Sequence, residues 1–89
     1  MNSIVATYDS IVDALDIALM PGVAATRTVS IDERRNVDLD ASGNVVAIEI
    51  LSPSGGMGID EIVDRFQLFH VKEELLRLQE LDFRPTQLV

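Results

Sequence analysis

Residues 38–49 carry oxygen atoms at the spacing of a calcium-binding loop. Asp38, Asp40, Ser42, the carbonyl oxygen of Asn44 and Glu49 fall at ligand positions of an EF-hand, and Gly43 stands where that loop turns sharply. An EF-hand also needs a helix on each side of the loop. The β-branched residues Thr28, Val29 and Ile31 precede the loop, and Pro53, Gly55 and Gly56 follow it closely. Neither flank therefore favours a helix.

The alternation of apolar and polar residues explains the same stretch as a β-hairpin. Val37 and Leu39 share one face of a strand, and Val46, Ile48 and Ile50 form an apolar row from which Glu49 points away. We expect an antiparallel hairpin over residues 36–51 with its turn at residues 41–44, and no calcium binding at cellular concentrations.

The other candidate sites lack essential residues. His70 is the one histidine and there is no cysteine, so a zinc site cannot be assembled, and a Ser-His pair would need a histidine that lies between Phe69 and Val71 in a helical segment. Asp9, Asp13 and Asp16 could gather around Mg²⁺ or Ca²⁺. Alternation, however, places Asp16 on the opposite face of its strand from Leu15 and Ile17, which favours a solvated Asp16 side chain. We expect no metal site.

Residues 54–58, with the sequence SGGMG, lack the lysine and the strand-loop-helix spacing of a phosphate-binding loop, and we interpret them as a hinge. The sequence therefore predicts no catalytic residue, no cofactor and no enzymatic activity.

Length and charge limit the function classes further. The 89 residues, 47% of them hydrophobic, suit one domain with one core (residues 1–89). Fifteen acidic against seven basic residues give a net charge of -8, so nucleic-acid binding is disfavoured and a basic protein partner is favoured. The same charge could simply keep a small domain soluble. The first residues lack a basic region and no apolar run is long enough for a membrane span, which favours a soluble cytoplasmic protein.

The first half of the chain reads as β-strands. Residues 4–9 alternate weakly, and residues 14–19 alternate more clearly, although residues 10–19 also fit a helical period. We choose a strand there because Pro21 and Gly22 end the run. Residues 24–31 form a third strand and residues 32–35 a charged loop before the hairpin. The expected fold class is α+β: an antiparallel meander of about five strands over residues 1–52, with a C-terminal helix or broken helix pair covering one face.

The covering segment follows a Gly/Ser/Pro linker at residues 53–58 and is helical over residues 59–84. One apolar stripe contains Ile59, Ile62, Val63 and Phe66, and a second contains Leu68, Val71, Leu75 and Leu78. These stripes lie roughly 150° apart on a straight helix, so one sheet cannot bury both. Either the chain breaks near residues 69–70, or the second stripe contacts another molecule. We expect a homodimer, with Leu68, Val71, Leu75 and Leu78 as the interaction residues.

Two blocks of the sequence also carry a resemblance. The first block is Tyr8-Asp9 with Asp13-Ala14-Leu15, and the second is Val37-Asp38-Leu39-Asp40 with Gly43-Asn44 and Ile48-Glu49-Ile50-Leu51. With these blocks, about residues 4–52 resemble the YuzO-like small bacterial family, a domain of unknown function. Asp16 stands where an aromatic residue is common in that family, and Ala47 where glycine is common. The resemblance implies no catalytic residues, and it implies an antitoxin-like partner of a small toxin.

Two function classes follow as expectations. The first is a small acidic protein-interaction module, in the form of an antitoxin-like neutraliser of a basic protein. The second is a small-molecule- or metal-binding regulatory domain, which would need a pocket between the sheet and the helix.

Overall fold

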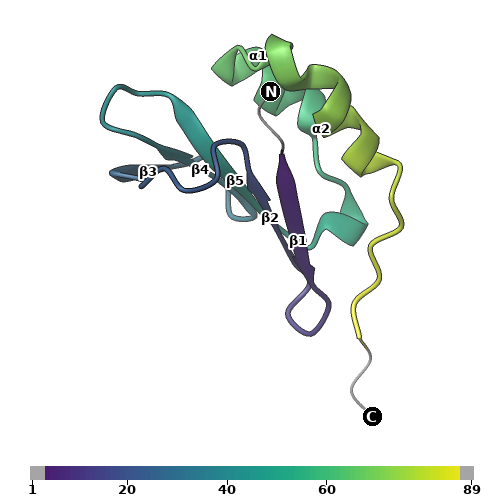
Figure 1. Cartoon of the computed structure of the whole chain (residues 1–89). Helices are drawn as coiled ribbons and strands as arrows, with labels where there is room; N and C mark the ends of the chain where they lie inside the picture. Colours follow the sequence, from purple (N-terminus) through teal and green to yellow (C-terminus); the bar gives the residue numbers. More distant parts are fainter. Residues whose placement is uncertain (1–3, 87–89) are drawn as a thin grey trace.

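The chain folds into one five-stranded antiparallel sheet with two helices against one face (Figure 1). The computed structural model describes residues 4–86. The strands are β1 (Val5–Asp9), β2 (Ala14–Ala18), β3 (Arg27–Ser30), β4 (Arg35–Leu39) and β5 (Val45–Leu51). The 3₁₀ turn η1 (Pro53–Gly55), helix α1 (Ile59–Phe66), the 3₁₀ turn η2 (Phe69–Val71) and helix α2 (Lys72–Gln79) follow. The predicted α+β class is confirmed.

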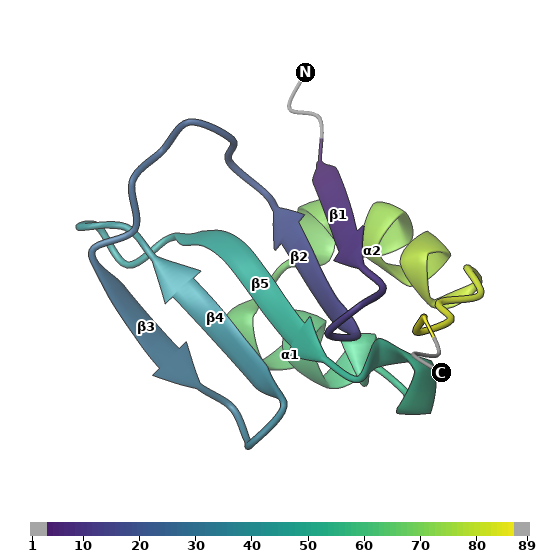
Figure 2. The ribbon, with the colours of Figure 1, turned by 90° about the horizontal axis from the view of Figure 1, so that it is seen from below.

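The order of the strands is β1-β2-β5-β4-β3, so the predicted meander is wrong at one connection (Figure 2). Residues 19–26 lead from β2 to the far edge of the sheet, and β5 pairs with β2 in the place expected for β3. The physical reason lies in the apolar rows. Leu15 and Ile17 of β2 pair with Ile50 and Ile48 of β5, and all four are buried, whereas β3 is short and rich in polar residues that tolerate an edge.

The predicted hairpin is confirmed as β4 and β5, with a register shift between Asp38 and Leu39. At its turn, the Asp40 carboxylate accepts hydrogen bonds from the backbone N–H groups of Ser42 and Asn44, both at 2.9 Å. The hydrogen bond from the Asn44 backbone lowers the pKa of Asp40. Gly43 adopts φ 87°, a conformation that suits glycine. The oxygen atoms of this stretch therefore serve a turn.

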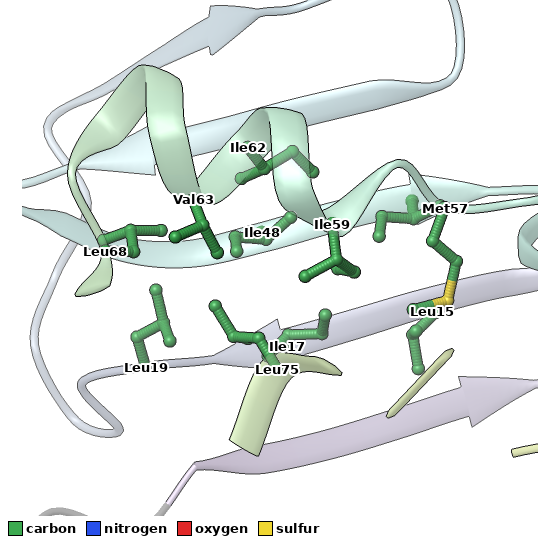
Figure 3. Close-up of a cluster of buried hydrophobic side chains, with 11 residues drawn as sticks. Leu15, Ile17, Leu19, Ile48, Met57, Ile59, Ile62, Val63, Leu68 and Leu75 are labelled. Atoms are coloured by element: carbon green, nitrogen blue, oxygen red, sulfur yellow. The ribbon is translucent and has the colours of Figure 1, made fainter. Parts of the chain in front are cut away.

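The core lies between the sheet and the helices (Figure 3). The sheet contributes buried side chains from β2 and β5, and the helical segment contributes Ile59, Ile62, Val63, Leu68 and Leu75. Ile17, Ile48 and Leu75 have no exposed surface, so residues from three separate elements meet in one cluster. Within residues 4–86, neither helix has the length and apolar content needed to cross a bilayer.

The helical segment breaks at Gln67, which has φ 56° and follows the last residue of α1. Residues 67–71 separate α1 from α2, so the predicted break near residues 69–70 is confirmed, and it lets α2 pack beside α1 on the same face of the sheet (Figure 1). Leu68 and Leu75 are buried in the core of their own chain, and Val71 and Leu78 are half-buried. The oligomeric state stays a prediction, but the geometric reason given for a dimer no longer applies to Leu68 and Leu75.

Candidate functional site

The face of the sheet that points away from the helices, here called the outer face, is open to solvent (Figure 2). Side chains alternate along a strand, so the residues between the buried Leu15, Ile17, Ile48 and Ile50 point to this face. In the pairing of β2 with β5, Asp16 lies directly across from Glu49, and Ala18 lies across from Ala47. The centre of the outer face therefore combines small side chains with two adjacent carboxylates.

The outer face is acidic throughout. Its outward strand positions carry four carboxylates, Asp9, Asp16, Asp38 and Glu49, and no arginine or lysine. The ion pairs within residues 4–86 join Arg35 to Asp32 and Glu61, and Arg84 to Asp82, so none of them neutralises an outer-face carboxylate. The Asp38 carboxylate accepts a hydrogen bond from Thr28 Oγ1 at 2.6 Å, which leaves its negative charge in place.

Two shallow hollows lie side by side on the outer face and share Thr7 and Asp16. One, of about 260 Å³, is also lined by Ala18, Asp38 and Ala47. The other, of about 280 Å³, is also lined by Asp9, Ala14 and Glu49. The alanines provide the room and the carboxylates provide the charge, so each hollow can accept a cationic side chain.

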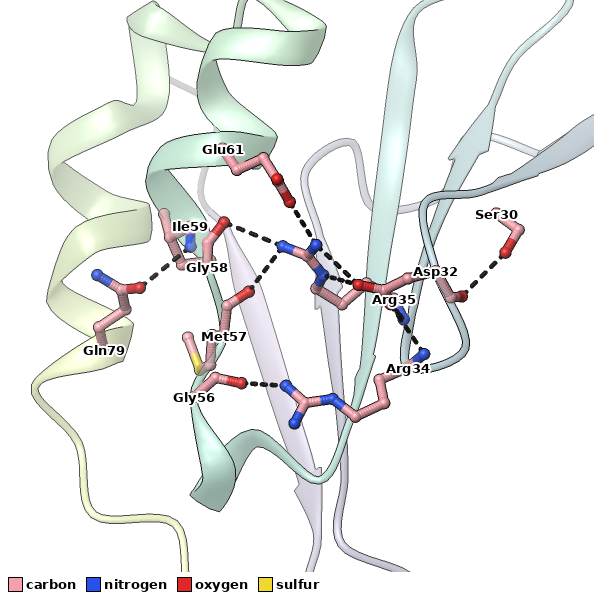
Figure 4. A network of polar contacts seen from close by, with 10 residues as sticks. All are labelled: Ser30, Asp32, Arg34, Arg35, Gly56, Met57, Gly58, Ile59, Glu61 and Gln79. Atoms are coloured by element: carbon pink, nitrogen blue, oxygen red, sulfur yellow. Dashed lines mark hydrogen bonds and ion pairs between the residues drawn. The ribbon is translucent and has the colours of Figure 1, made fainter.

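A second polar cluster joins the β3–β4 loop to the segment before α1 (Figure 4). Arg34 donates to the Gly56 carbonyl at 2.6 Å, and Arg35 donates to the carbonyls of Met57 and Gly58 at 3.4 and 3.3 Å. Arg35 also pairs with Asp32 and Glu61. The hydrogen bond with Asp32 raises the pKa of Arg35, and the same bond lowers the pKa of Asp32. This cluster fixes the segment predicted as a hinge, and each of its groups already has a partner inside the chain.

A third cluster surrounds Asp13, which adopts φ 52° in the turn between β1 and β2. Its carboxylate accepts hydrogen bonds from the Tyr8 hydroxyl at 2.7 Å and from the Ser54 hydroxyl at 2.9 Å. Partial burial raises the pKa of Tyr8 to about 12, and the hydrogen bond to Asp13 and the charges of Asp13 and Asp9 add to the rise. The Phe83 ring lies against Tyr8, with 5.0 Å between ring centroids. Asp13 thus fastens β1, β2 and η1 together.

The structure does not bring Asp9, Asp13 and Asp16 together as metal ligands. Asp13 faces Tyr8 and Ser54, whereas Asp16 points to the outer face. No three histidine, aspartate or glutamate side chains in the described part of the chain lie close enough to hold a metal ion. His70 lines a separate hollow of about 520 Å³ near the hairpin turn, with mostly apolar neighbours that include Leu19, Phe66 and Val71.

Sequence reasoning placed Asp16 and Glu49 on solvent-facing sides of two strands but did not place them next to each other. Their proximity depends on the pairing of β2 with β5, which the predicted meander excluded. The alternation of each strand was the available signal, and the order of the strands was the missing one.

Comparison with known proteins gives a family and no activity. The model of the DUF2283 family, a protein of unknown function, matches residues 6–54, which is more than half of the chain. No curated protein and no solved structure matches. The match includes most of β1 and all of β2 to β5, and it ends in η1 before the helices. It shows a small domain of unknown function and does not confirm the YuzO-like assignment. The chain belongs to the DUF2283 family of proteins of unknown function.

Proposed function

We propose that this chain is a small, non-enzymatic protein-interaction module that binds a basic protein partner through the outer face of its sheet. The observation that carries the proposal is the set of four outward carboxylates, Asp9, Asp16, Asp38 and Glu49, with no arginine or lysine at the outward strand positions.

The energetics of the central pair support a cationic partner. Asp16 and Glu49 are directly opposed across two strands, and like charges in that position destabilise a sheet. An arginine or lysine placed between them would turn that repulsion into two attractions. Complementary charge also speeds association between proteins and selects against acidic partners.

The more specific form of this proposal is an antitoxin-like neutraliser in the bacterial cytoplasm, which binds a small basic toxin. The resemblance of residues 4–52 to the YuzO-like family supports this form. The binding mode needs one copy of the chain, and a homodimer is a separate proposal.

Co-expression with the product of the neighbouring gene tests the proposal. The chain is tagged and purified as wild type, as Asp16→Asn/Glu49→Gln, and as the matched control Glu73→Gln/Glu74→Gln, which removes two charges from exposed positions of α2. The wild type and the helix control should retain a basic partner, and the sheet variant should lose most of it. Equal retention by both variants, or no retained protein with the wild type, would contradict the proposal.

A small-molecule-binding regulator is the alternative. The hollow of about 520 Å³ that contains His70 supports it, because ligand sites commonly have this size and combine apolar side chains with a few polar groups. Native mass spectrometry of the purified chain distinguishes the two. A retained small molecule without a protein partner favours the alternative.

A further inference from the structure

Strand β1 forms one edge of the sheet and has hydrogen-bonding groups that face solvent. In an antiparallel sheet, successive residues of a strand direct their N–H and C=O groups to opposite sides. The Ser52 N–H donates to the Asp13 carbonyl at 2.7 Å, which shows that the odd-numbered residues of β2 bond to β5. The even-numbered residues of β2 therefore bond to β1. The register pairs Asp16 with Thr7, so the backbone groups of Thr7 bond to β2. The N–H and C=O groups of the residues on either side of it, Ala6 and Tyr8, therefore point away from the sheet.

The backbone carbonyl of Ser10, two residues after Tyr8, points outward as well and already accepts a backbone hydrogen bond. The Ser10 carbonyl accepts the N–H of Thr86 at 2.7 Å, and the two hydroxyl groups also lie 2.7 Å apart. Within residues 4–86, Ala6 and Tyr8 have no such backbone partner on this side. The β1 edge is therefore open where the C-terminal segment does not reach it.

Helix α2 extends past this edge on the side of the core, as both ribbon views show (Figures 1 and 2). Leu76 and Leu78 of α2 are half-buried, and Leu81 just after the helix is 56% exposed. A strand added beside β1 would lie next to α2 on its inner side and next to the acidic outer face on its other side. Its side chains would then alternate between apolar and basic.

The distribution of charge favours β1 over the other edge strand, and it favours a basic partner over a second copy of the chain. Both edge strands pair with a strand that carries an outer-face carboxylate, Asp16 beside β1 and Asp38 beside β3, but β1 also carries the outward Asp9, whereas β3 carries no carboxylate and has Arg27 on its inner side. A second copy of the chain would bring its own net charge of -8 to the same edge. We infer that the basic partner of the proposed function supplies an extended segment with alternating basic and apolar residues, which adds to β1 as a sixth strand. This inference rests on the proposed function.

The test uses a capped peptide of sequence Arg-Val-Arg-Val-Arg-Val-Arg and a scrambled control of sequence Arg-Arg-Val-Val-Val-Arg-Arg, with fluorescence anisotropy as the readout. The variant Ala6→Pro removes an outward N–H and no bond to β2, which an edge strand tolerates. Ser30→Pro is the matched control on β3, because the Ile31 N–H bonds to Arg35 and the Ser30 N–H therefore faces outward, while the Ser30 hydroxyl bonds to the Asp32 carbonyl and to no outer-face carboxylate. Thermal unfolding checks that each variant is folded.

We expect the wild type and Ser30→Pro to bind the alternating peptide equally, and Ala6→Pro to bind it about tenfold more weakly, since it loses a backbone hydrogen bond and introduces a clash. The amides of Ala6 and Tyr8 should become protected from hydrogen exchange in the complex. If Ala6→Pro does not fold, a peptide N-methylated at its valines gives the same test on the wild type. In an antiparallel pairing, those valines lie opposite Ala6 and Tyr8, so the methylated peptide should not bind.

Equal binding by Ala6→Pro and the wild type, or equal binding of the scrambled and alternating peptides, overturns the inference. If Asp16→Asn/Glu49→Gln still weakens binding in that case, the outer face binds basic segments without strand addition and the proposed function stands. If the wild type binds no peptide, or if this charge variant binds as the wild type does, the proposed function fails as well.

Discussion

Asp16 lies directly across from Glu49 on the outer face of the sheet. The alternating hydrogen bonds between β2 and β5 make this a non-hydrogen-bonded pair, the arrangement in which opposed side chains come closest. Two like charges therefore meet at the centre of an open face, although neither is needed for the core. A sequence selected for stability alone would not favour this pair, and a binding function would explain it.

Removing one charge of this pair should stabilise the protein. We expect Glu49→Gln to raise the free energy of unfolding by about 0.2–1 kcal/mol, the range for cross-strand pairs. Glu73→Gln on the exposed side of α2 is the control and should change it less. Urea unfolding at low ionic strength measures both. A loss of stability in Glu49→Gln would show that the charge strengthens the hydrogen bond that Glu49 accepts from Asn36 Nδ2, at 3.5 Å, by more than the repulsion costs.

Shortening the side chain of Ile48, the residue before Glu49, should destabilise the protein. Ile48 is fully buried and pairs with Ile17 on one side and Val37 on the other. We expect Ile48→Ala to lower the free energy of unfolding by about 2–5 kcal/mol, because the change loses apolar burial and leaves a cavity. Glu49→Ala should cost little. Equal losses at positions 48 and 49 would contradict the register of the hairpin.

The sequence predicted the parts of this fold that depend on local patterns. Alternation identified the β4–β5 hairpin and chose a strand over a helix for residues 14–19. It could not give the order of the strands, because the pairing of β2 with β5 depends on which apolar rows pack together in three dimensions. The juxtaposition of Asp16 and Glu49 follows from that order, so it could not be predicted either.

The sequence also placed Arg35 in a solvated loop, whereas its side chain is only 12% exposed and binds the segment before α1. This contact joins residues more than twenty positions apart, so no local pattern encodes it. The predicted break near residues 69–70 lies between α1 and α2, but the residue at which it begins is Gln67, whose left-handed conformation its residue type does not predict.

Gly58 should not tolerate a side chain. It adopts φ 62°, and an added Cβ would collide with the Arg35 guanidinium. We expect Gly58→Ala to lower the free energy of unfolding by about 1–3 kcal/mol through backbone strain and displacement of Arg35. Gly43→Ala is the control, because its φ is also positive, at 87°, and its Cβ would meet open space. Equal losses in the two variants would show that the Arg35 contact adds nothing.

Tyr8 should ionise at unusually high pH. It is the one tyrosine of a chain without tryptophan, so absorbance at alkaline pH reports it alone. We expect a midpoint near a pKa of about 12 in the folded protein, and a lower midpoint in Asp13→Asn, which loses the charge and the acceptor strength of Asp13. A midpoint near 10.0, the ordinary pKa of the tyrosine side chain, in the folded wild type would contradict this environment.

The same shift links Tyr8 to stability. Because the pKa is higher in the folded state, the contribution of Tyr8 is fully present below its ordinary pKa of 10.0 and is lost as the pH rises through about 12. Tyr8→Phe should therefore flatten the fall in stability over that range. Asp9→Asn should change the tyrosine midpoint less than Asp13→Asn, because Asp9 acts only through its charge.

The most direct test of the proposed function is the affinity of the alternating Arg-Val peptide for three forms of the chain, measured at one ionic strength. These are the wild type, Asp16→Asn/Glu49→Gln and Glu73→Gln/Glu74→Gln, and the two variants have the same net charge. Binding through the outer face predicts that the sheet variant binds about fivefold more weakly than the wild type, the cost of two exposed ion pairs, while the helix variant stays close to the wild type. Equal affinities of the two variants would show that the peptide responds only to net charge, and would contradict a site on the outer face.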